Sequence, residues 1–245
     1  MTFDPFGDFE TEGYLQNSLK LKDPLEVKES EHLSFEASSE DALAYLAKQK
    51  PIDYKAVLKT HEILFSGFYP WAGKDRNELV PHLAVFKGSK DDPHHTIFER
   101  PDLIKRSVEY AFELAANKKR FRQRPGEVMG QLASAYPFLD GNGRTILLIY
   151  MELCYRTRFA IDWPKTNKDD YLRALADEIR DPFTGHLDGY LAPFVIDISS
   201  RDEWPAMIGG IKGLDGLDKE GITYESLDDP EVQRLYKAYR ATPLE

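Results

Sequence analysis

The feature that most constrains this chain of 245 residues is the segment Ala135-Tyr136-Pro137-Phe138-Leu139-Asp140-Gly141-Asn142-Gly143-Arg144-Thr145. A helix-like run from Gly126 to Ala135 precedes it, and an apolar run from Thr145 to Tyr155 follows it. The second run is hydrophobic nearly all round, which is typical of a central buried helix. The segment therefore predicts a short loop between two packed helices.

The loop combines groups that bind anions with a group that binds cations. Gly141 and Gly143 permit backbone conformations that other residues resist, so successive N–H groups can converge where the next helix begins. Arg144 adds a planar fork that matches phosphate oxygens, and Asp140 offers a hard oxygen ligand of the kind that Mg²⁺ prefers. The loop predicts binding of a nucleotide or another phosphoanhydride. The alternative is an ordinary helix–turn–helix corner, because Asp-Gly-Asn-Gly is common turn chemistry.

Residues 136–147 resemble the signature of the Fic (Fido) family, His-x-Phe-x-Asp/Glu-Gly-Asn-Gly-Arg-x-x-Arg. The positions that match are Phe138, Asp140, Gly141, Asn142, Gly143 and Arg144. The resemblance implies a protein adenylyltransferase-like enzyme, which moves AMP or a related phosphate-containing group from a nucleotide onto a hydroxyl of a target protein. It implies catalytic positions at Tyr136 and Asn142, nucleotide binding by Gly141, Asn142, Gly143 and Arg144, and a metal (Mg²⁺) ligand at Asp140.

Two further stretches extend the resemblance over roughly residues 38–200. Residues 68–76 look like the Pro-Trp-Ala-Gly-x-x-Arg segment that enters the family's flap, and residues 160–175 resemble the segment that closes its nucleotide pocket. The implied fold is mainly α, a Fic-type helical bundle with a small β-hairpin flap. We expect the flap at residues 79–86, where a target segment adds as a strand. The expected target-docking residues are Leu79, Val80, Leu83 and Val85.

Tyr136 stands where the family has its catalytic histidine. A histidine with an ordinary pKa near 6.5 is largely neutral and basic at pH 7, whereas a phenol with a pKa near 10 is a poor base. Loss of a positioned general base typically lowers a rate by about 10²–10⁴-fold, so binding is expected to survive while transfer is weak or lost. Three explanations stay open: a substitution that silences the enzyme, a native residue of a diverged member, or a side chain that only packs over the pocket.

Leu147 stands where the family has its second arginine. That arginine usually grips the γ-phosphate and pairs with a glutamate in an inhibitory Ser/Thr-x-x-x-Glu-Gly/Asn motif. Glu12-Gly13 and Glu220-Gly221 occur, but Asp8 and Gly216 stand where Ser or Thr is required. The usual self-inhibition is therefore not predicted, which leaves room for a separate inhibitor protein. It also leaves room for a cosubstrate other than ATP, such as a diphosphate-linked metabolite.

Composition narrows the partners and the setting. The net charge of −10 argues against non-specific binding to nucleic acid or to an anionic membrane. The single cysteine, Cys154, excludes an intramolecular disulfide, and no apolar run reaches membrane-spanning length. The N-terminus lacks the basic start and apolar core of a signal peptide. We expect a cytoplasmic protein, or an effector exported without a recognisable signal peptide.

The chain is expected to divide into three parts. Residues 1–37 are charged and poorly periodic, which predicts an N-terminal extension, with the first helix starting at Ser38 as its N-cap. Residues 38–200 form the Fic-like core, and residues 201–245 form a C-terminal tail with a short helix from Pro230 to Arg240. The predicted function is a Fic-fold transferase impaired at its base. The alternative is a non-catalytic nucleotide-binding regulatory or interaction module.

Overall fold

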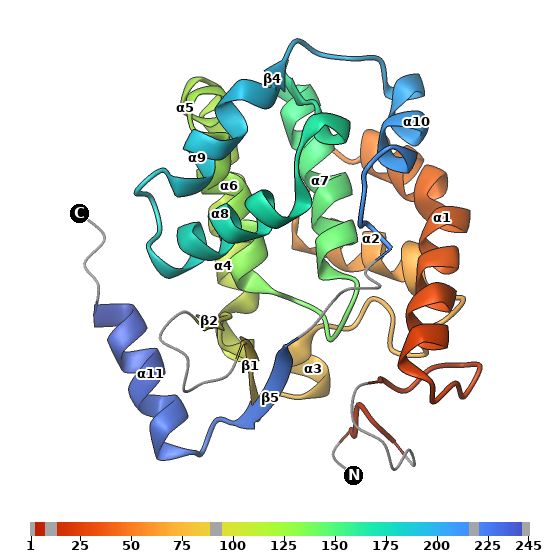
Figure 1. The fold of residues 1–245 in the computed structure, drawn as a ribbon, viewed down its shortest axis with the longest axis vertical. Coiled ribbons are helices and arrows are strands. Elements are labelled where there is room, and N and C mark those ends of the chain that lie inside the picture. The colour runs from red at the N-terminus through yellow and green to blue at the C-terminus, as the bar shows by residue number, and fades with distance from the viewer. Residues whose placement is uncertain (1–2, 8–13, 89–94, 216–220, 242–245) are drawn as a thin grey trace.

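The structure, a computed structural model, describes residues 3–7, 14–88, 95–215 and 221–241 (Figure 1). It is mainly helical, as predicted. The α-helices are α1 (Pro24–Lys48), α2 (Tyr54–Phe65), α3 (Arg76–Leu79), α4 (Ile104–Ala116), α5 (Lys118–Gln123), α6 (Pro125–Ala135), α7 (Asn142–Arg156), α8 (Lys168–Arg180), α9 (His186–Leu191), α10 (Trp204–Gly209) and α11 (Pro230–Ala241). Short 3₁₀ turns lie at Pro101–Leu103, Trp163–Lys165, Ala192–Phe194 and Arg201–Glu203.

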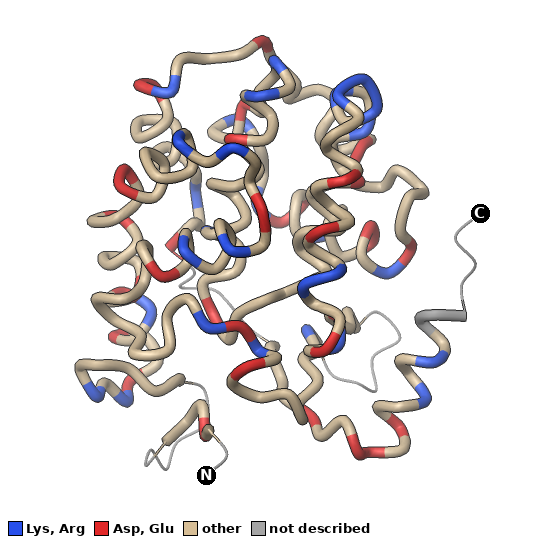
Figure 2. Tube along the Cα trace, turned by 180° about the vertical axis from the view of Figure 1, so that it is seen from behind, with Lys and Arg blue, Asp and Glu red and all other residues tan. Residues whose placement is uncertain are grey.

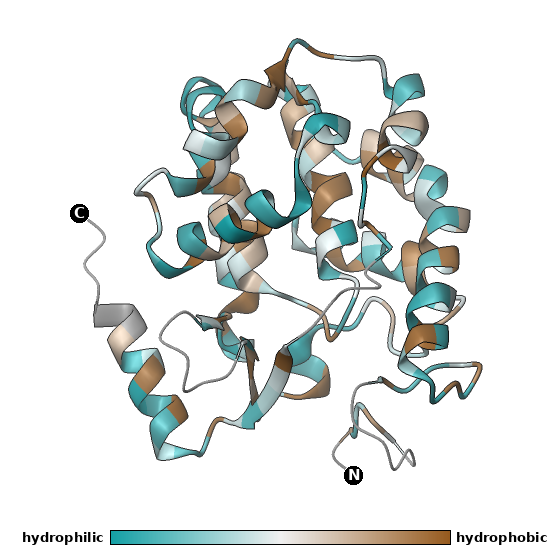
Figure 3. Cartoon of the chain, viewed as in Figure 1, coloured by the Kyte–Doolittle hydropathy of each residue, from teal (hydrophilic) through white to brown (hydrophobic). Residues whose placement is uncertain are grey.

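Helix α7 is the centre of the bundle, as its all-round apolar sequence predicts. Eleven of its residues are buried, and α1, α2 and α6 pack around it. Figure 3 shows the hydrophobic colouring concentrated on α7 and on the faces of its neighbours that turn toward it. The helix that carries the motif at its N-terminus is therefore deeply embedded in the fold.

Helix α1 begins 14 residues earlier than the predicted start at Ser38, so that prediction is wrong. The carboxylate of Asp23 accepts hydrogen bonds from the N–H groups of Leu25 and Glu26, and Pro24 occupies the first turn, which is a strong helix start. Val27 and Phe35 are buried in the core. Part of the expected extension is thus a packed helix, and its weak amphipathic periodicity concealed it.

Within the described residues, five short strands form two antiparallel sheets. They are β1 (Leu83–Lys87), β2 (Thr96–Ile97), β3 (Ala160–Ile161), β4 (Val195–Ile196) and β5 (Ile222–Ser226). The first sheet has the order β2-β1-β5, and the second pairs β3 with β4. The predicted hairpin flap is present as β1 and β2, but it lies later in the chain than residues 79–86 because α3 occupies Arg76–Leu79.

The C-terminal tail contains the predicted helix as α11, and it also supplies β5. In Figure 1, β5 lies beside β1 at the lower end of the bundle, and the chain then turns into α11, which stands at the lower left of the view. The sequence pattern did not predict this strand.

Charged residues follow no single face of the molecule. Figure 2 shows Asp and Glu interspersed with Lys and Arg along most helices, with basic residues concentrated on α5. Within the described part of the chain, no helix combines the length and the apolar character needed to cross a bilayer.

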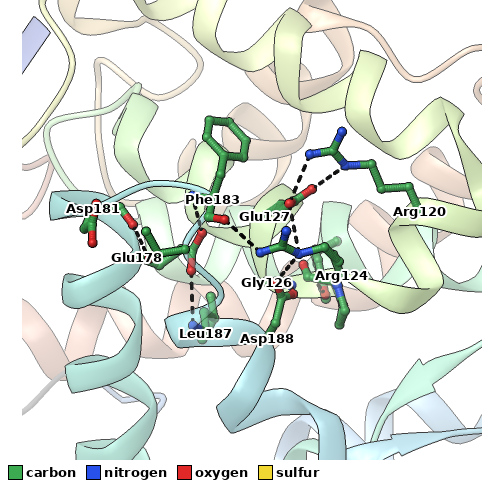
Figure 4. Close-up of polar contacts among 12 residues, drawn as sticks. Arg120, Arg124, Gly126, Glu127, Glu178, Asp181, Phe183, Leu187 and Asp188 are labelled. Carbon is green, nitrogen blue, oxygen red and sulfur yellow. Dashed lines mark hydrogen bonds and ion pairs between the residues drawn. The ribbon is translucent and has the colours of Figure 1, made fainter. Parts of the chain in front are cut away.

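A buried polar network fixes the N-terminal end of α6, the helix that leads into the motif (Figure 4). Glu127 is nearly inaccessible, and both Arg120 and Arg124 contact its carboxylate at 2.7–3.1 Å. Asp188 accepts a hydrogen bond of 2.6 Å from the Gly126 N–H and also pairs with Arg124. These bonds tie the N-terminal end of α6 to α5 and α9, and so fix the position of the helix that leads into the motif.

Candidate active site at the start of the central helix

The motif loop, defined here as residues 136–144, joins α6 to α7. Gly141 is its conformational pivot: it is the N-cap of α7 with φ of +73°, in the left-handed region that favours glycine. A Cβ at this position would lie 2.4 Å from Cε2 of Phe65. Both the backbone conformation and the packing therefore require glycine, as the loop chemistry predicted.

The first turn of α7 contains N–H groups that the helix itself leaves without an acceptor. Thr145 is the residue whose N–H bonds back to the carbonyl of Gly141, at 3.0 Å. The N–H groups of Asn142, Gly143 and Arg144 come before it and have no acceptor within their own helix. Together with the helix dipole, they make the start of this 15-residue helix an anion-binding position.

Gly143 contributes space rather than an unusual conformation. It is exposed and helical, and a Cβ built on it would meet nothing within 4 Å. The expectation that Gly143 supplies special backbone geometry is therefore wrong. Its missing side chain leaves open room over the first turn of α7, where a ligand can approach the backbone.

Arg144 is buried, and its guanidinium is only half used by the protein. Nη2 lies 2.6 Å from Oε1 of Glu31 on α1, and the guanidinium carbon lies 5.1 Å from the ring centroid of Phe65. Among the described residues, Nη1 is buried without a hydrogen-bond partner. Burial acts to lower the pKa of Arg144, but the charges of Glu31 and Asp140 outweigh it, and the net shift is upward.

The side chain of Asn142 bonds the backbone of the loop itself. Its Oδ1 accepts from the Phe138 N–H at 2.9 Å, and its Nδ2 donates to the Phe138 carbonyl at 2.7 Å. Both ends of the amide are engaged by the loop backbone, so the side chain shapes the loop. The backbone N–H of Asn142 keeps its place in the first turn of α7.

Asp140 lies at the partly exposed rim of the loop, and its Oδ1 accepts a hydrogen bond of 2.7 Å from the Gly141 N–H. Within the described ranges, no three His, Cys, Asp or Glu side chains gather as a metal site. Mg²⁺ is commonly held by one or two carboxylates together with substrate phosphates. Asp140 fits that mode as a single protein ligand.

His61 of α2 supports the loop through contacts with Phe138 and Asp140, and no sequence pattern predicted this role. Its Nδ1 accepts from the Gly73 N–H at 2.9 Å, so its Nε2 carries the proton and donates to the Asp140 carbonyl at 3.1 Å. Its ring stacks on Phe138 with a centroid separation of 3.8 Å. Burial lowers the pKa of His61 to about 3. Because both nitrogens are engaged, His61 does not replace the missing histidine as a base.

Arg76, the last residue of the Pro-Trp-Ala-Gly-x-x-Arg segment, holds the other end of the loop. It is fully buried. Its Nε donates to the Tyr136 carbonyl and its Nη2 to the Glu99 carbonyl, both at 2.7 Å, and its own N–H donates to the Pro137 carbonyl. Burial lowers the pKa of this arginine from its ordinary value. The motif residue of the flap segment is thus a structural clamp.

Tyr136 caps α6 in a left-handed conformation, with φ of +40°. Its ring stacks on Phe98, with centroids 4.1 Å apart, and it belongs to a small buried cluster with Val85 and Ile179. The side chain therefore has a packing role under the flap. Of the three explanations for Tyr136, packing is the one with direct contacts; the other two concern the origin of the residue and remain open.

The other predicted positions are mostly inaccessible as side chains. Leu147 is buried in the main core. Leu79 and Val80 are buried there too, at the end of α3. Val85 is buried on the face of β1 that packs against Tyr136, and Leu83 is half-buried. Only Leu83 and Val85 lie on β1. Both edges of β1 are paired, one with β2 and the other with β5.

The comparisons with known proteins place these features in a family. Residues 51–154 match the family model described as Fic/DOC family. Over 173 residues the chain is 30% identical to "Protein adenylyltransferase VbhT" of Bartonella schoenbuchensis. The aligned region covers 70% of this chain and 35% of that protein. The chain therefore spans about a third of that relative's length. It is 26% identical to "Probable protein adenylyltransferase y4lH" of Sinorhizobium fredii, covering 75% of this chain and 88% of the relative.

Solved structures share the fold. The BepC protein of Bartonella tribocorum, determined with bound AMPPNP, aligns with a TM-score of 0.61 and 16% identity over 78% of this chain and 96% of that one. The N-terminal Fic domain of a putative cell filamentation protein from Bartonella quintana, determined with bound ADP, aligns with a TM-score of 0.61 and 18% identity over 77% and 94%. At these identities the likeness concerns the fold alone.

Proposed function

Because this chain belongs to the Fic/DOC family, we propose that its motif loop binds a nucleoside triphosphate and serves transfer of AMP, or a related phosphate-containing group, to a hydroxyl of a target protein. The two relatives are named as adenylyltransferases, the second as a probable one. The part of this chain that matches the family model includes the motif loop. In its present form, with Tyr136 at the position of the base, transfer is slow or absent while binding persists.

The observation that carries the proposal is the half-used guanidinium of Arg144. A buried arginine whose Nη1 has no partner among the described residues is costly, because an unsatisfied charged donor loses its hydration without compensation. A phosphate oxygen at the start of α7 would satisfy it. The open space over Gly143 lies in the same turn. The Arg144 donor left unpaired by the described residues, the dipole of α7 and the open space over Gly143 therefore all favour an anionic ligand at the start of α7.

In the proposed reaction, the hydroxyl oxygen of the target attacks the α-phosphorus of the nucleotide. A new P–O bond forms, the P–O bond to the β-phosphate breaks, and pyrophosphate leaves. The N–H groups of residues 142–144 and the Arg144 guanidinium would hold the phosphates. Mg²⁺, when bound through Asp140 and phosphate oxygens, would supply neutralisation of the phosphate charge.

The hydroxyl proton is the difficulty in this chain. A neutral phenol at position 136 accepts a proton poorly near pH 7, and the two nitrogens of His61 are already engaged. The packing of Tyr136 on Phe98 favours the second candidate function, a non-catalytic nucleotide-binding regulatory or interaction module. The two candidates share the binding site and differ in whether a base can be restored.

The experiment has two stages. Calorimetry of the unmodified chain with ATP or ADP, with and without Mg²⁺, should show binding, and Arg144→Ala should weaken it. Transfer of AMP from α-labelled ATP to proteins of a lysate is then compared between the unmodified chain, Tyr136→His and the control Tyr136→Phe. We expect Tyr136→His alone to raise transfer by at least roughly 10²-fold, the lower end of what a general base contributes. A chain that binds no nucleotide contradicts the proposal, whereas binding without transfer in Tyr136→His supports the non-catalytic candidate.

A further inference from the structure

One edge of strand β1 in the flap is paired with a strand from the C-terminal part of the same chain, β5. β5 pairs with β1 in antiparallel register over five residues, from Leu83 opposite Ser226 to Lys87 opposite Ile222. The pairing continues at both ends: the Gly88 N–H donates to the Gly221 carbonyl at 2.8 Å, and the Leu227 N–H donates to the His82 carbonyl at 2.9 Å. The edge of β1 on which a target strand could add is therefore filled by residues 221–227 (Figure 1).

Helix α11 holds this strand in place. Val232 and Tyr236 are buried in a cluster with Ala84, Phe86 and Ile97 of the flap. The Tyr236 hydroxyl also donates to the Phe98 carbonyl at 2.9 Å. Residues 221–238 thus dock on the flap through a strand, a buried apolar contact and a long-range hydrogen bond, so the pairing is a built contact rather than a chance approach of two strands.

The register of β5 selects which hydroxyl faces the motif loop. Side chains alternate across a strand, so Tyr224, opposite Val85, lies on the other face from Thr223, opposite Phe86. Tyr224 packs against the cluster that contains Val85 and Tyr136, whereas Thr223 is exposed. The pairing therefore places two side-chain hydroxyls of β5, those of Tyr224 and Ser226, on the same face. Ser226 is exposed and its Oγ accepts a hydrogen bond of 3.2 Å from the Asp228 N–H, so Tyr224 is the one of the two that packs against this cluster.

The hydroxyl of Tyr224 reaches the loop itself. It donates a hydrogen bond of 3.0 Å to the carbonyl of Leu139, the residue before Asp140. The ring of Tyr224 is half-buried, and Phe6 meets it edge-on with centroids 6.1 Å apart. An acceptor hydroxyl delivered by an extended segment on this edge would need the arrangement that Tyr224 has: a strand paired with β1 and a hydroxyl at the motif loop.

We propose that β5 occupies the target-docking edge as an intramolecular substrate strand, and that Tyr224 is the acceptor of a self-modification. The inference rests on the proposed function, because it uses the same nucleotide and the same loop. The Tyr224 oxygen forms a bond to the α-phosphorus of the nucleoside triphosphate, the bond to the β-phosphate breaks, and pyrophosphate leaves. In the variant Tyr136→His the Tyr224 proton passes to the imidazole at position 136. In the present sequence, where a phenol stands there, the proton passes to solvent and the step is correspondingly slow.

The test uses the full chain carrying Tyr136→His, incubated with α-labelled ATP and Mg²⁺ and read by intact mass and peptide mapping. We expect one AMP per chain on Tyr224, formed at a rate independent of protein concentration because donor loop and acceptor belong to one molecule. Adding Tyr224→Phe, which keeps the ring, should lower incorporation at least tenfold. The matched control Thr223→Ala removes a hydroxyl from the opposite face of the same strand and should leave incorporation unchanged.

A second variant covers the case in which Tyr136→His does not fold. Tyr136→Gly suits the left-handed backbone at this position, and imidazole added to the solution can serve as the base. Labelling of Tyr224 that rises with imidazole supports the inference. Equal incorporation with and without Tyr224, or transfer to lysate proteins with none to Tyr224, overturns it while the proposed function stands. Failure to bind any nucleotide overturns the proposed function and this inference together.

Discussion

The carboxylate of Glu31 lies 2.6 Å from Nη2 of Arg144, and both side chains are buried. One belongs to the first helix of the chain and the other to the first turn of the central helix. The pair holds the Arg144 guanidinium in place, and it also puts a negative charge beside the position proposed for the phosphates. Glu31 is therefore expected to compete with an anionic ligand.

The first prediction is that Glu31→Gln tightens nucleotide binding by about tenfold, which is about 1.4 kcal/mol. The amide keeps the shape of the side chain but removes the competing charge. Without nucleotide, the variant should unfold more easily by about 1–3 kcal/mol, because a buried guanidinium loses its ionic partner. Thermal unfolding with and without ATP measures both effects.

The control for this variant lies one turn and a half further along α1. Glu36→Gln removes an exposed carboxylate that pairs only with His32, so neither affinity nor stability should change measurably. Weaker nucleotide binding by Glu31→Gln would mean that Glu31 orients the arginine rather than competing with the ligand.

The second prediction separates stability from binding at Gly143. Gly143→Ala should stabilise the fold by about 0.5–1 kcal/mol, because alanine is a better helix former and its methyl meets no neighbour. The same methyl would enter the space over the first turn of α7, so ATP affinity should fall. Denaturant unfolding of the variant measures the expected gain in stability, and calorimetry measures the expected loss of ATP affinity.

Gly189→Ala is the matched control, since Gly189 is also exposed, helical and open to an added Cβ. It should give a comparable gain in stability with unchanged ATP affinity. If both variants bind ATP as the unmodified chain does, the ligand does not approach the backbone at Gly143.

The third prediction concerns pH and His61. The pKa of His61 is near 3 in the folded chain and near 6.5 when unfolded, so the unfolded state binds the extra proton between these values. The contribution is fully present above about pH 6.5, and it is lost as pH falls toward 3. The free energy of unfolding should therefore drop by about 1.4 kcal/mol per pH unit in this window from His61 alone.

His61→Gln, which can still accept and donate a hydrogen bond but does not titrate, should flatten this acid limb. Urea unfolding at several pH values between 4 and 7 measures the slope. His186→Gln, at an exposed histidine, serves as the control and should leave the slope unchanged. An acid limb of unchanged slope in His61→Gln would contradict the assignment of His61 as a buried neutral group.

The fourth prediction concerns the clamp at Arg76. Arg76→Lys retains the charge but cannot reach the carbonyls of both Tyr136 and Glu99, so stability should fall by about 2–4 kcal/mol. Nucleotide affinity should fall with it, because the loop loses one of its supports. Arg100→Lys, at an exposed arginine paired with Asp102, should change both by little. A stable Arg76→Lys variant with normal affinity would show that the loop holds its shape without the clamp.

The motif loop is the part of the site that could be predicted from sequence. A left-handed glycine before a helix, an arginine in the first turn of that helix and an apolar helix behind them are local features, and each leaves a mark on neighbouring residues. The left-handed conformation of Gly141 and the buried helix α7 are confirmed on that basis, whereas phosphate binding by Arg144 stays a prediction. The special backbone geometry expected of Gly143 was wrong, and the hydrogen bonds between the Asn142 side chain and the Phe138 backbone were not predicted, because sequence does not tell which side chains the loop backbone engages.

Only the tertiary structure decided what surrounds the loop. Glu31, His61 and Tyr224 come from three distant segments, and nothing in their local sequence marks them as neighbours of the motif. The same holds for β5, a short strand whose partner is chosen by which edge lets it bury Tyr224 and satisfy its backbone. Local chemistry is written in adjacent residues, whereas long-range pairing depends on the competition of all segments for burial and hydrogen bonds, which is settled only when the whole chain folds.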